Sequence, residues 1–478
     1  MPGLPGIGNG IYPGAFDSMR AADIDSDGSI EVVFGNFDGF VEVLEQRFVG
    51  SDSQVVFVPE YRSPPLGSGI SALDVGSLDG VQKHIICGSS VGKIHRIRVN
   101  GPDSYSYVEQ PFTTQTLSRG FISWLVIGEF HYGTSGKEVL IQNEESEWLL
   151  FNKNGSLMAK TSRVPDPNAA DPLDVDNFTG PCGKPVAVFW PPAEPTDSQI
   201  AFLPGMDGFL RQLWYFPGPP AKLKVQIVSD YLGGAGRCAY FWDPAGTPAP
   251  VIIVGCRQGD GHALWMVDPS LPVGQRLIAS IDQVIDGNKA IPLGEAVTIE
   301  KFATNEILVV HGPNLTRVGL TGDPRGFSDQ PAPPAPVNVE IEGIGTEEEL
   351  PESEYFGVSP EIGGVERYGS GSQTRYVVTT PAGRVWVLNN VLGYTRYTDT
   401  LYLPDNSDRL HWYSNRSLGH LSTIDEDPVA PGTLWVSEAT NTYRRDQLAC
   451  RRRVSPRGKS ACFLCKRSNV RRRRTLEP

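Results

Sequence analysis

Near the amino terminus, four carboxylate side chains crowd into nine residues: Asp23, Asp25, Asp27 and Glu31. Like charges at this spacing repel one another unless a cation neutralises them, and loops of alternating carboxylates suit the oxygen coordination of Ca²⁺. Gly28 permits the sharp turn that wraps such a loop, and the carbonyl of Ser29 adds a backbone oxygen. β-branched and aromatic residues follow at 32–34, so a strand follows the loop at once. The pattern therefore predicts a calcium loop that Glu31 closes.

Two short β-patterned runs follow this loop, separated by "FG" and then "DG". The whole arrangement, D-x-D-x-D-G-x-x-E with the "FG" behind it, resembles the FG-GAP repeat, also called the VCBS repeat. That repeat builds the β-propeller head of integrin α chains and many secreted bacterial and fungal proteins. The resemblance implies that Asp23, Asp25, Asp27, Glu31 and the carbonyl of Ser29 bind Ca²⁺. It also implies that loops on one propeller face bind a protein or glycan ligand in an adhesion or scaffold role.

Later parts of the chain keep the acidic loop only in part. The stretch "DVDNFTGPCGKPVAVFW" offers Asp174 and Asp176 as a second, incomplete calcium site, with Pro185 near the place of the closing carboxylate. The other units lack the alternating triplet. We therefore expect one complete calcium site and a weak second one at Asp174 and Asp176.

Other patterns with chemical potential favour structural roles. "GSSVG" at 88–92 fits the nucleophile elbow of hydrolases, but an alternating strand pattern follows it instead of a helix, so a hairpin turn is predicted. The histidines do not pair at metal-ligand spacing. Cys462 and Cys465 form one C-x-x-C, and Cys450 adds a third thiolate where a structural zinc site needs four ligands. We predict no catalytic residues from these patterns.

The elements that position the loop are predicted by a repeated hairpin. An apolar run, a turn and a second alternating strand recur every 50 to 68 residues, with turn residues at Gly35, Gly88, Asn143, Gly205, Gly255, Gly312, Thr380 and Glu438. A period in this range with about four strands per unit is typical of a propeller blade. The sequence thus predicts an all-β fold, a seven-bladed or eight-bladed β-propeller of four-stranded antiparallel blades. A strand near Trp435 that joined the first blade would leave seven.

Composition agrees with many short strands and turns, because the chain has 52 glycines and 40 prolines. No apolar run is long enough for a transmembrane helix. The first residues lack the pattern of a signal peptide, so we expect either an intracellular protein or a cell-surface one whose signal segment is missing from this sequence.

Charge divides the chain into a body and a tail. The net charge is −13, but residues 444–478 carry thirteen Lys or Arg and two Asp or Glu, a local +11 that leaves −24 for the rest. We expect an extension at 1–14, one propeller at 15–443 with an acidic, proline-rich insertion at 329–354, and a disordered basic tail at 444–478. Nucleic acid or anionic membrane would bind only through the tail.

Three functions fit these features. The leading one is a non-catalytic, calcium-binding propeller that binds protein or carbohydrate. The first alternative is a propeller-fold polysaccharide lyase, which predicts a cluster of Lys, Arg, His and acidic side chains along the central channel. The second is an intracellular structural subunit of a larger assembly.

Overall fold

The structure is a computed structural model that describes residues 19–464 with several gaps. The gaps are at 36–38, 50–53, 114–121, 133–134, 144–146, 162–181, 191–197, 244–249, 258–261, 313, 332–334, 341–363, 369–373, 380–384, 393, 397–410, 415–419, 427–433, 440–448 and 455–459. Every element in the described part is a β-strand, and none of it forms a helix that could cross a membrane.

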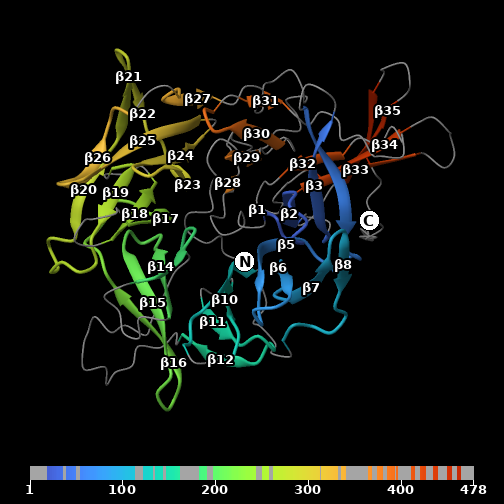
Figure 1. Cartoon of the computed structure of the whole chain (residues 1–478), viewed down its shortest axis with the longest axis horizontal. Helices are drawn as coiled ribbons and strands as arrows, with labels where there is room; N and C mark the ends of the chain where they lie inside the picture. The colour runs from blue at the N-terminus through green and yellow to red at the C-terminus, as the bar shows by residue number, and fades with distance from the viewer. Residues whose placement is uncertain are drawn as a thin grey trace, which may run out of the picture.

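Seven four-stranded antiparallel sheets form the blades of a ring (Figure 1). The first three blades consist of β1 (Met19–Ala22), β2 (Glu31–Gly35), β3 (Val41–Val49) and β4 (Gln54–Arg62); β5 (Ile70–Ser77), β6 (Lys83–Ser89), β7 (Ile94–Gly101) and β8 (Ser104–Tyr107); and β9 (Ile122–Gly128), β10 (Glu138–Asn143), β11 (Trp148–Phe151) and β12 (Leu157–Lys160). The next two consist of β13 (Val186–Phe189), β14 (Gln199–Pro204), β15 (Leu210–Phe216) and β16 (Lys222–Ile227); and β17 (Gly236–Trp242), β18 (Val251–Cys256), β19 (Leu264–Val267) and β20 (Leu277–Ile281). The last two consist of β23 (Ala296–Ala303), β24 (Glu306–His311), β25 (Asn314–Gly322) and β26 (Arg325–Ser328); and β28 (Gly364–Tyr368), β29 (Arg375–Thr379), β30 (Val385–Asn389) and β31 (Tyr394–Arg396).

The structure therefore confirms the all-β propeller and fixes the number of blades at seven. Seven of the eight predicted turns lie at or beside the end of the second strand of a blade. The eighth, at Glu438, lies in β34 (Leu434–Ala439), which belongs to a separate five-stranded sheet. The prediction of an eighth blade is therefore wrong. The suggestion that a strand near Trp435 completes the first blade is wrong too, because β1 takes that place.

The repeated glycine has a packing reason. A Cβ on Gly35 would lie 2.2 Å from Cγ2 of Ile70, and one on Gly88 would lie 2.6 Å from Cβ of Ile122. Ile70 and Ile122 begin the innermost strands of the following blades, β5 and β9. At these positions glycine lets the next blade approach closely. Glycine therefore recurs near the end of the second strand because neighbouring blades pack there.

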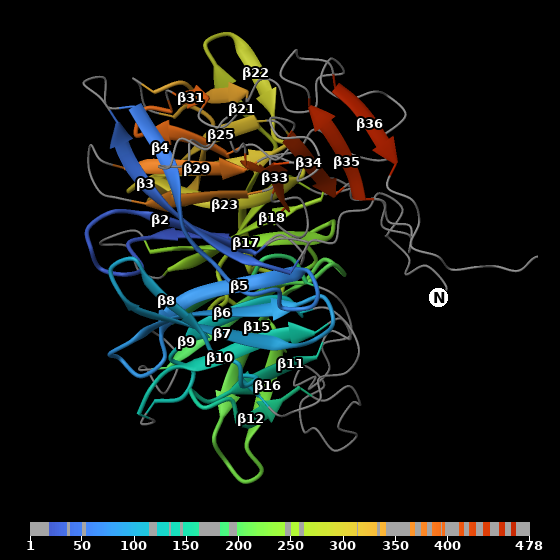
Figure 2. The same cartoon turned by 90° about the vertical axis from the view of Figure 1, so that its right-hand side faces the viewer.

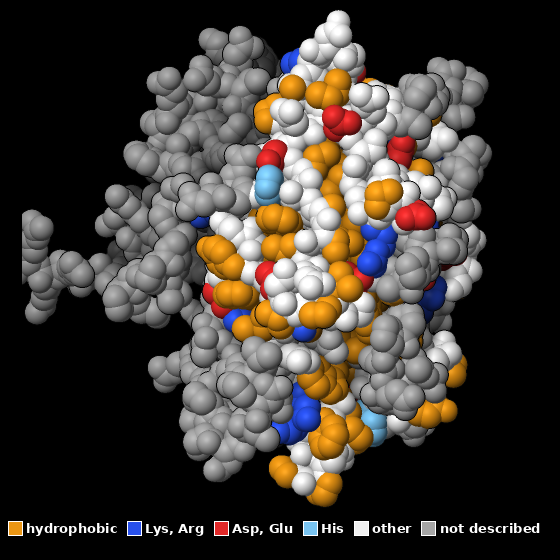
Figure 3. Space-filling model, turned by 90° about the vertical axis from the view of Figure 1, so that its left-hand side faces the viewer, with side chains coloured by type: hydrophobic (Ala, Val, Ile, Leu, Met, Phe, Trp, Pro, Cys, Tyr) orange, Lys and Arg blue, Asp and Glu red, His pale blue; other side chains and the backbone are white. Residues whose placement is uncertain are grey.

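Apolar side chains fill the space between neighbouring blades. Trp124 and Trp148 of the third blade, for example, share a buried cluster with Leu213 of the fourth. The outermost strands are half-buried, as in β20 and β26, and Figure 3 shows hydrophobic side chains spread between polar ones on that side of the ring. Both tryptophans are buried, so they pack between blades and are not available to stack on a ligand.

Three features lie outside the seven blades. A hairpin of β21 (Gln283–Asp286) and β22 (Lys289–Pro292) is inserted between the fifth and sixth blades. Within the proline-rich insertion, β27 (Asn338–Glu340) pairs with β25, so this part is ordered against the sixth blade. The third feature is a sheet of β32 (His411–Ser414), β33 (His420–Glu426), β34, β35 (Ala449–Val454) and β36 (Ser460–Leu464).

This last sheet includes strands from the expected body of the chain and from its expected tail. Figure 2 shows β34, β35 and β36 to one side of the stacked blades. The described strands of the seven blades lie between Met19 and Arg396, and β35 and β36 lie within the segment 444–478. The boundary at 443 and the disorder of the tail stay predictions.

Candidate metal centre

The predicted calcium loop forms the connection between β1 and β2. Carboxylate oxygens of Asp23, Asp25 and Asp27 all lie within 4.8 Å of one another. Two residues of the loop have left-handed backbone, Ser26 with φ of 69° and Gly28 with φ of 97°. These turns fold the segment back on itself, and the side chains at alternate positions converge as the sequence predicts.

Backbone N–H groups hold the three carboxylates in place. Asp23 Oδ1 accepts from the N–H of Ser26 at 2.7 Å, and Asp27 Oδ1 accepts from the N–H of Ser29 at 2.7 Å. Asp25 Oδ1 accepts from the N–H of Asp27 at 3.2 Å. Because a carboxylate oxygen has two acceptor sites, each of these groups retains capacity for a cation.

Glu31 lies at the base of the loop and is fully buried. Its Oε2 accepts from the N–H of Ile24 at 2.6 Å, whereas its Oε1 is buried without a hydrogen-bond partner. Burial raises the pKa of Glu31 to about 8, the Ile24 N–H opposes this, and the charges of Asp25 and Asp23 add to it. A buried carboxylate oxygen without a partner is costly, and a cation would satisfy it. The three converging aspartates therefore fit Ca²⁺ as ligands. Glu31 is not part of the converging group, and Glu31 and the Ser29 carbonyl stay predicted ligands.

The second blade clamps the loop from the side. The N–H of Asp103, in the turn between β7 and β8, donates to Asp25 Oδ2 at 2.8 Å. Lys83, at the start of β6, donates from Nζ to the carbonyl of Asp23 at 2.7 Å and to Ser26 Oγ at 3.1 Å. The sequence analysis missed both residues, because neither stands in a motif and both lie more than fifty residues beyond the loop.

A further carboxyl group, that of Glu60, interacts with the carboxylates of the loop. Tyr105 Oη donates to Glu60 Oε2 at 2.9 Å. Burial raises the pKa of Glu60 to about 8, and so do the carboxyl of Asp103 and the charges of Asp25 and Glu31. A divalent cation in the loop would relieve this excess of negative charge.

The other residues that the sequence analysis singled out are either outside the described residues or in structural positions. Asp174 and Asp176 lie outside the described residues. "GSSVG" is a hairpin turn between β6 and β7, closed by a hydrogen bond from the N–H of Gly92 to the carbonyl of Ser89. His95 and His311 are buried in structural hydrogen bonds to Tyr107 and Thr316.

Charged side chains do meet at the axis of the ring. Lys184 Nζ lies 3.6 Å from Glu366 Oε1, although Lys184 precedes β13 in the fourth blade and Glu366 belongs to the seventh. Arg20 of β1 lies 3.8 Å from the same oxygen by its Nη1 and 2.9 Å from Asp74 Oδ1 by its Nε. An ion pair between blades that are not neighbours places the group at the axis, where β1, β5 and β28 face one another (Figure 1).

Glu300 of β23 lies near this group. The surrounding protein raises the pKa of Glu300 by desolvation, and the charge of Glu366 raises it further, whereas Lys184 and Arg20 lower it. The axis therefore carries Arg, Lys and acidic side chains, as the lyase alternative predicts, but each of its two cations is already within ion-pair distance of a carboxylate.

Comparisons with known proteins return structures only. No family model and no curated protein match the chain, so membership of the FG-GAP/VCBS family is not confirmed. Among solved structures, the chain is similar to BBS1N in a complex with ARL6DN soaked with lead, with 12% identity over 96% of this chain and 97% of that chain and a TM-score of 0.37. It is also similar to the C-terminal WD40 domain of Sif2, with 11% identity over 88% of this chain and 93% of that chain and a TM-score of 0.42.

Proposed function

We propose that this chain is a calcium-binding β-propeller that acts as a scaffold for a protein partner. The observation that supports calcium binding is the convergence of Asp23, Asp25 and Asp27. Glu31, at the end of the same loop, adds a buried Oε1 without a hydrogen-bond partner. Ca²⁺ in this loop would stiffen the connection between β1 and β2 and, through Asp25, its junction with the second blade.

A protein partner is favoured by exposed apolar side chains on the face that carries the metal loop. In each blade, the connections between the first and second strands reach this face. Val81 is 89% exposed between β5 and β6, Tyr132 is 60% exposed between β9 and β10, and Phe189 is 51% exposed at the end of β13. Aromatic and apolar side chains in this situation are typical of protein interfaces.

Calcium binding is tested by melting the full chain with calcium and with a chelator. At a calcium concentration about 100 times Kd, the ion should add about 2.7 kcal/mol to the free energy of unfolding, since it binds the folded state. Asp25→Asn should remove the difference between the two conditions. Asp79→Asn is the matched control, because Asp79 shapes the corresponding loop of the second blade through the N–H groups of Val81 and Gln82. If the wild type has the same melting temperature with calcium and with chelator, the loop does not bind calcium and this part of the proposal is wrong.

The scaffold role is tested by capture on the immobilised full chain. A partner that uses the metal-loop face should be retained by the wild type and lost from a Val81→Ser, Tyr132→Ser double variant. Val91→Ser is the control, because Val91 is 54% exposed in the turn between β6 and β7, on the opposite face of the ring. Equal retention by both variants would argue against this face.

A further inference from the structure

Among the described strands, the first and the seventh blade share no sheet. Many rings are fastened by a blade that mixes strands from both ends of the chain, but here β1–β4 and β28–β31 each form a separate sheet of consecutive strands. β1 contacts β28, yet none of the described strands of the first blade pairs with one of the seventh. Side chains must therefore hold this closing junction.

Glu366 stands at the junction and is reached from two directions. Arg20 approaches its Oε1 from the first blade, and Lys184 approaches the same atom from the fourth, across the axis. Arg20 is fixed in turn by Asp74 of the second blade, whose Oδ2 accepts from the N–H of Ile127 in the third at 2.8 Å. The chain of contacts thus links five blades through one carboxylate of the last.

Burial gives these pairs more strength than pairs on an open surface. The side chains of Arg20, Asp74 and Glu366 are 15–18% exposed and that of Lys184 is 27% exposed. Charges in such a position are weakly screened by water, and loss of one partner leaves the others uncompensated.

We propose that Glu366 is an electrostatic clasp that closes the propeller, by holding the seventh blade to the first through Arg20 and to the fourth through Lys184. The ring should open first at the junction of β1 and β28 when this carboxylate loses its charge. This device is independent of calcium, since none of its four side chains belongs to the metal loop.

Glu300 provides an internal comparison. It lies on the same axis, on the neighbouring strand β23, but its carboxylate forms no ion pair with a described cation, and Glu366 repels it. Replacing Glu300 by glutamine removes its repulsion by Glu366 together with its attraction to Lys184 and Arg20. Replacing Glu366 by glutamine removes the ion pairs with Arg20 and Lys184. The two substitutions are chemically identical, but only Glu366→Gln should weaken the junction.

The test is hydrogen exchange, measured by mass spectrometry, on the full chain. In Glu366→Gln, amides of β1 and β28 should exchange about ten times faster than in the wild type, as expected for loss of a partly buried charge pair. Those of β17 and β18, in the fifth blade, should be unchanged. Glu300→Gln should exchange at β1 and β28 no faster than the wild type. Asp207→Asn, which breaks the half-exposed pair with Arg211 in the fourth blade, should not affect the junction.

A second variant covers the case in which Glu366→Gln does not fold. Lys184→Met removes only the arm across the axis, and it should also accelerate exchange at β28 while sparing β17. The proposal is overturned if Glu366→Gln and Glu300→Gln change the junction equally, or if exchange rises uniformly over all blades. It is also overturned if Lys184→Met leaves β28 unchanged.

Discussion

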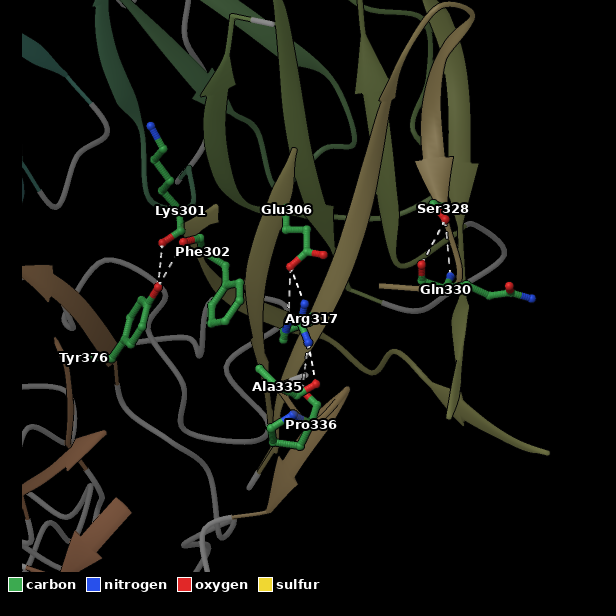
Figure 4. A network of polar contacts seen from close by, with 9 residues as sticks. All are labelled: Lys301, Phe302, Glu306, Arg317, Ser328, Gln330, Ala335, Pro336 and Tyr376. Atoms are coloured by element: carbon green, nitrogen blue, oxygen red, sulfur yellow. Dashed lines mark hydrogen bonds and ion pairs between the residues drawn. The ribbon is translucent and has the colours of Figure 1, made fainter. Parts of the chain in front are cut away.

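Arg317→Met should be among the most destabilising single substitutions in the sixth blade. Arg317 is 2% exposed, and its Nε and Nη2 donate to Glu306 Oε2 at 3.1 and 2.5 Å (Figure 4). Its Nη1 donates to the carbonyl of Ala335 at 2.6 Å, and its guanidinium lies 4.5 Å from the ring centre of Phe302. Phe302 stacks in turn on Tyr376 of the seventh blade. One side chain thus ties β24, the proline-rich segment and the next blade together.

The expected loss follows from burial. The side chain of Glu306 is only 10% exposed, so Arg317→Met leaves a buried carboxylate without its partner, which costs about 3–5 kcal/mol. Glu306→Gln should cost about 2–3 kcal/mol, because the carbonyls beside β27 still accept from Arg317. The double variant should cost about 4 kcal/mol, below the sum of about 5–8 kcal/mol for the two single variants, since it leaves no buried carboxylate without its charged partner.

Urea unfolding of the three variants measures this coupling, and hydrogen exchange of Asn338–Glu340 reports whether β27 detaches. Arg211→Met is a suitable control, because the partner of Arg211, Asp207, is 51% exposed and can be solvated when left alone. If the losses of the two single variants add to within about 0.5 kcal/mol, Arg317 and Glu306 are not coupled and the reasoning fails.

Two further expectations concern a turn and a histidine. Gly155→Ala should lower the free energy of unfolding by at least about 2 kcal/mol more than Gly274→Ala. Both glycines have positive φ, but only at Gly155 would an added Cβ collide with the backbone, at the carbonyl oxygen of Phe112. Thermal unfolding compares the two variants. Burial lowers the pKa of His311 to about 4, so the unfolded chain binds this proton first and stability falls as pH drops from about 6.5 to 4, by up to about 1.4 kcal/mol per pH unit. His311→Gln should remove that part of the slope.

If Gly155→Ala and Gly274→Ala lower the free energy of unfolding equally, the backbone near residue 155 can move away from the added Cβ without loss of stability, and the expectation is wrong. If the ring signal of His311, identified by its loss in His311→Gln, titrates near pH 6.5 in the folded protein, the expected lowering of the His311 pKa is wrong.

The sequence determined the architecture of the blades, because the signals for hairpins are local. Turn residues such as Gly35 and Gly88 recur at blade spacing because the next blade needs the room of a missing side chain. The convergence of Asp23, Asp25 and Asp27 was predictable for the same reason, since alternate positions around Gly28 are brought together by a few backbone angles. Calcium itself stays a prediction.

Tertiary structure decided what those local units meet. Lys83 and Asp103 clamp the metal loop from the second blade, and Lys184 meets Glu366 across the axis, over separations in the chain that leave no mark in any short motif. The number of blades was decided in the same way: the hairpin at Glu438 has the pattern of a blade but pairs with β35 instead of joining the ring. The periodicity of a sequence indicates which residues form a strand. The burial of a side chain, its charged partner and the closure of the ring depend instead on which strands become neighbours, and only the folded structure specifies those neighbours.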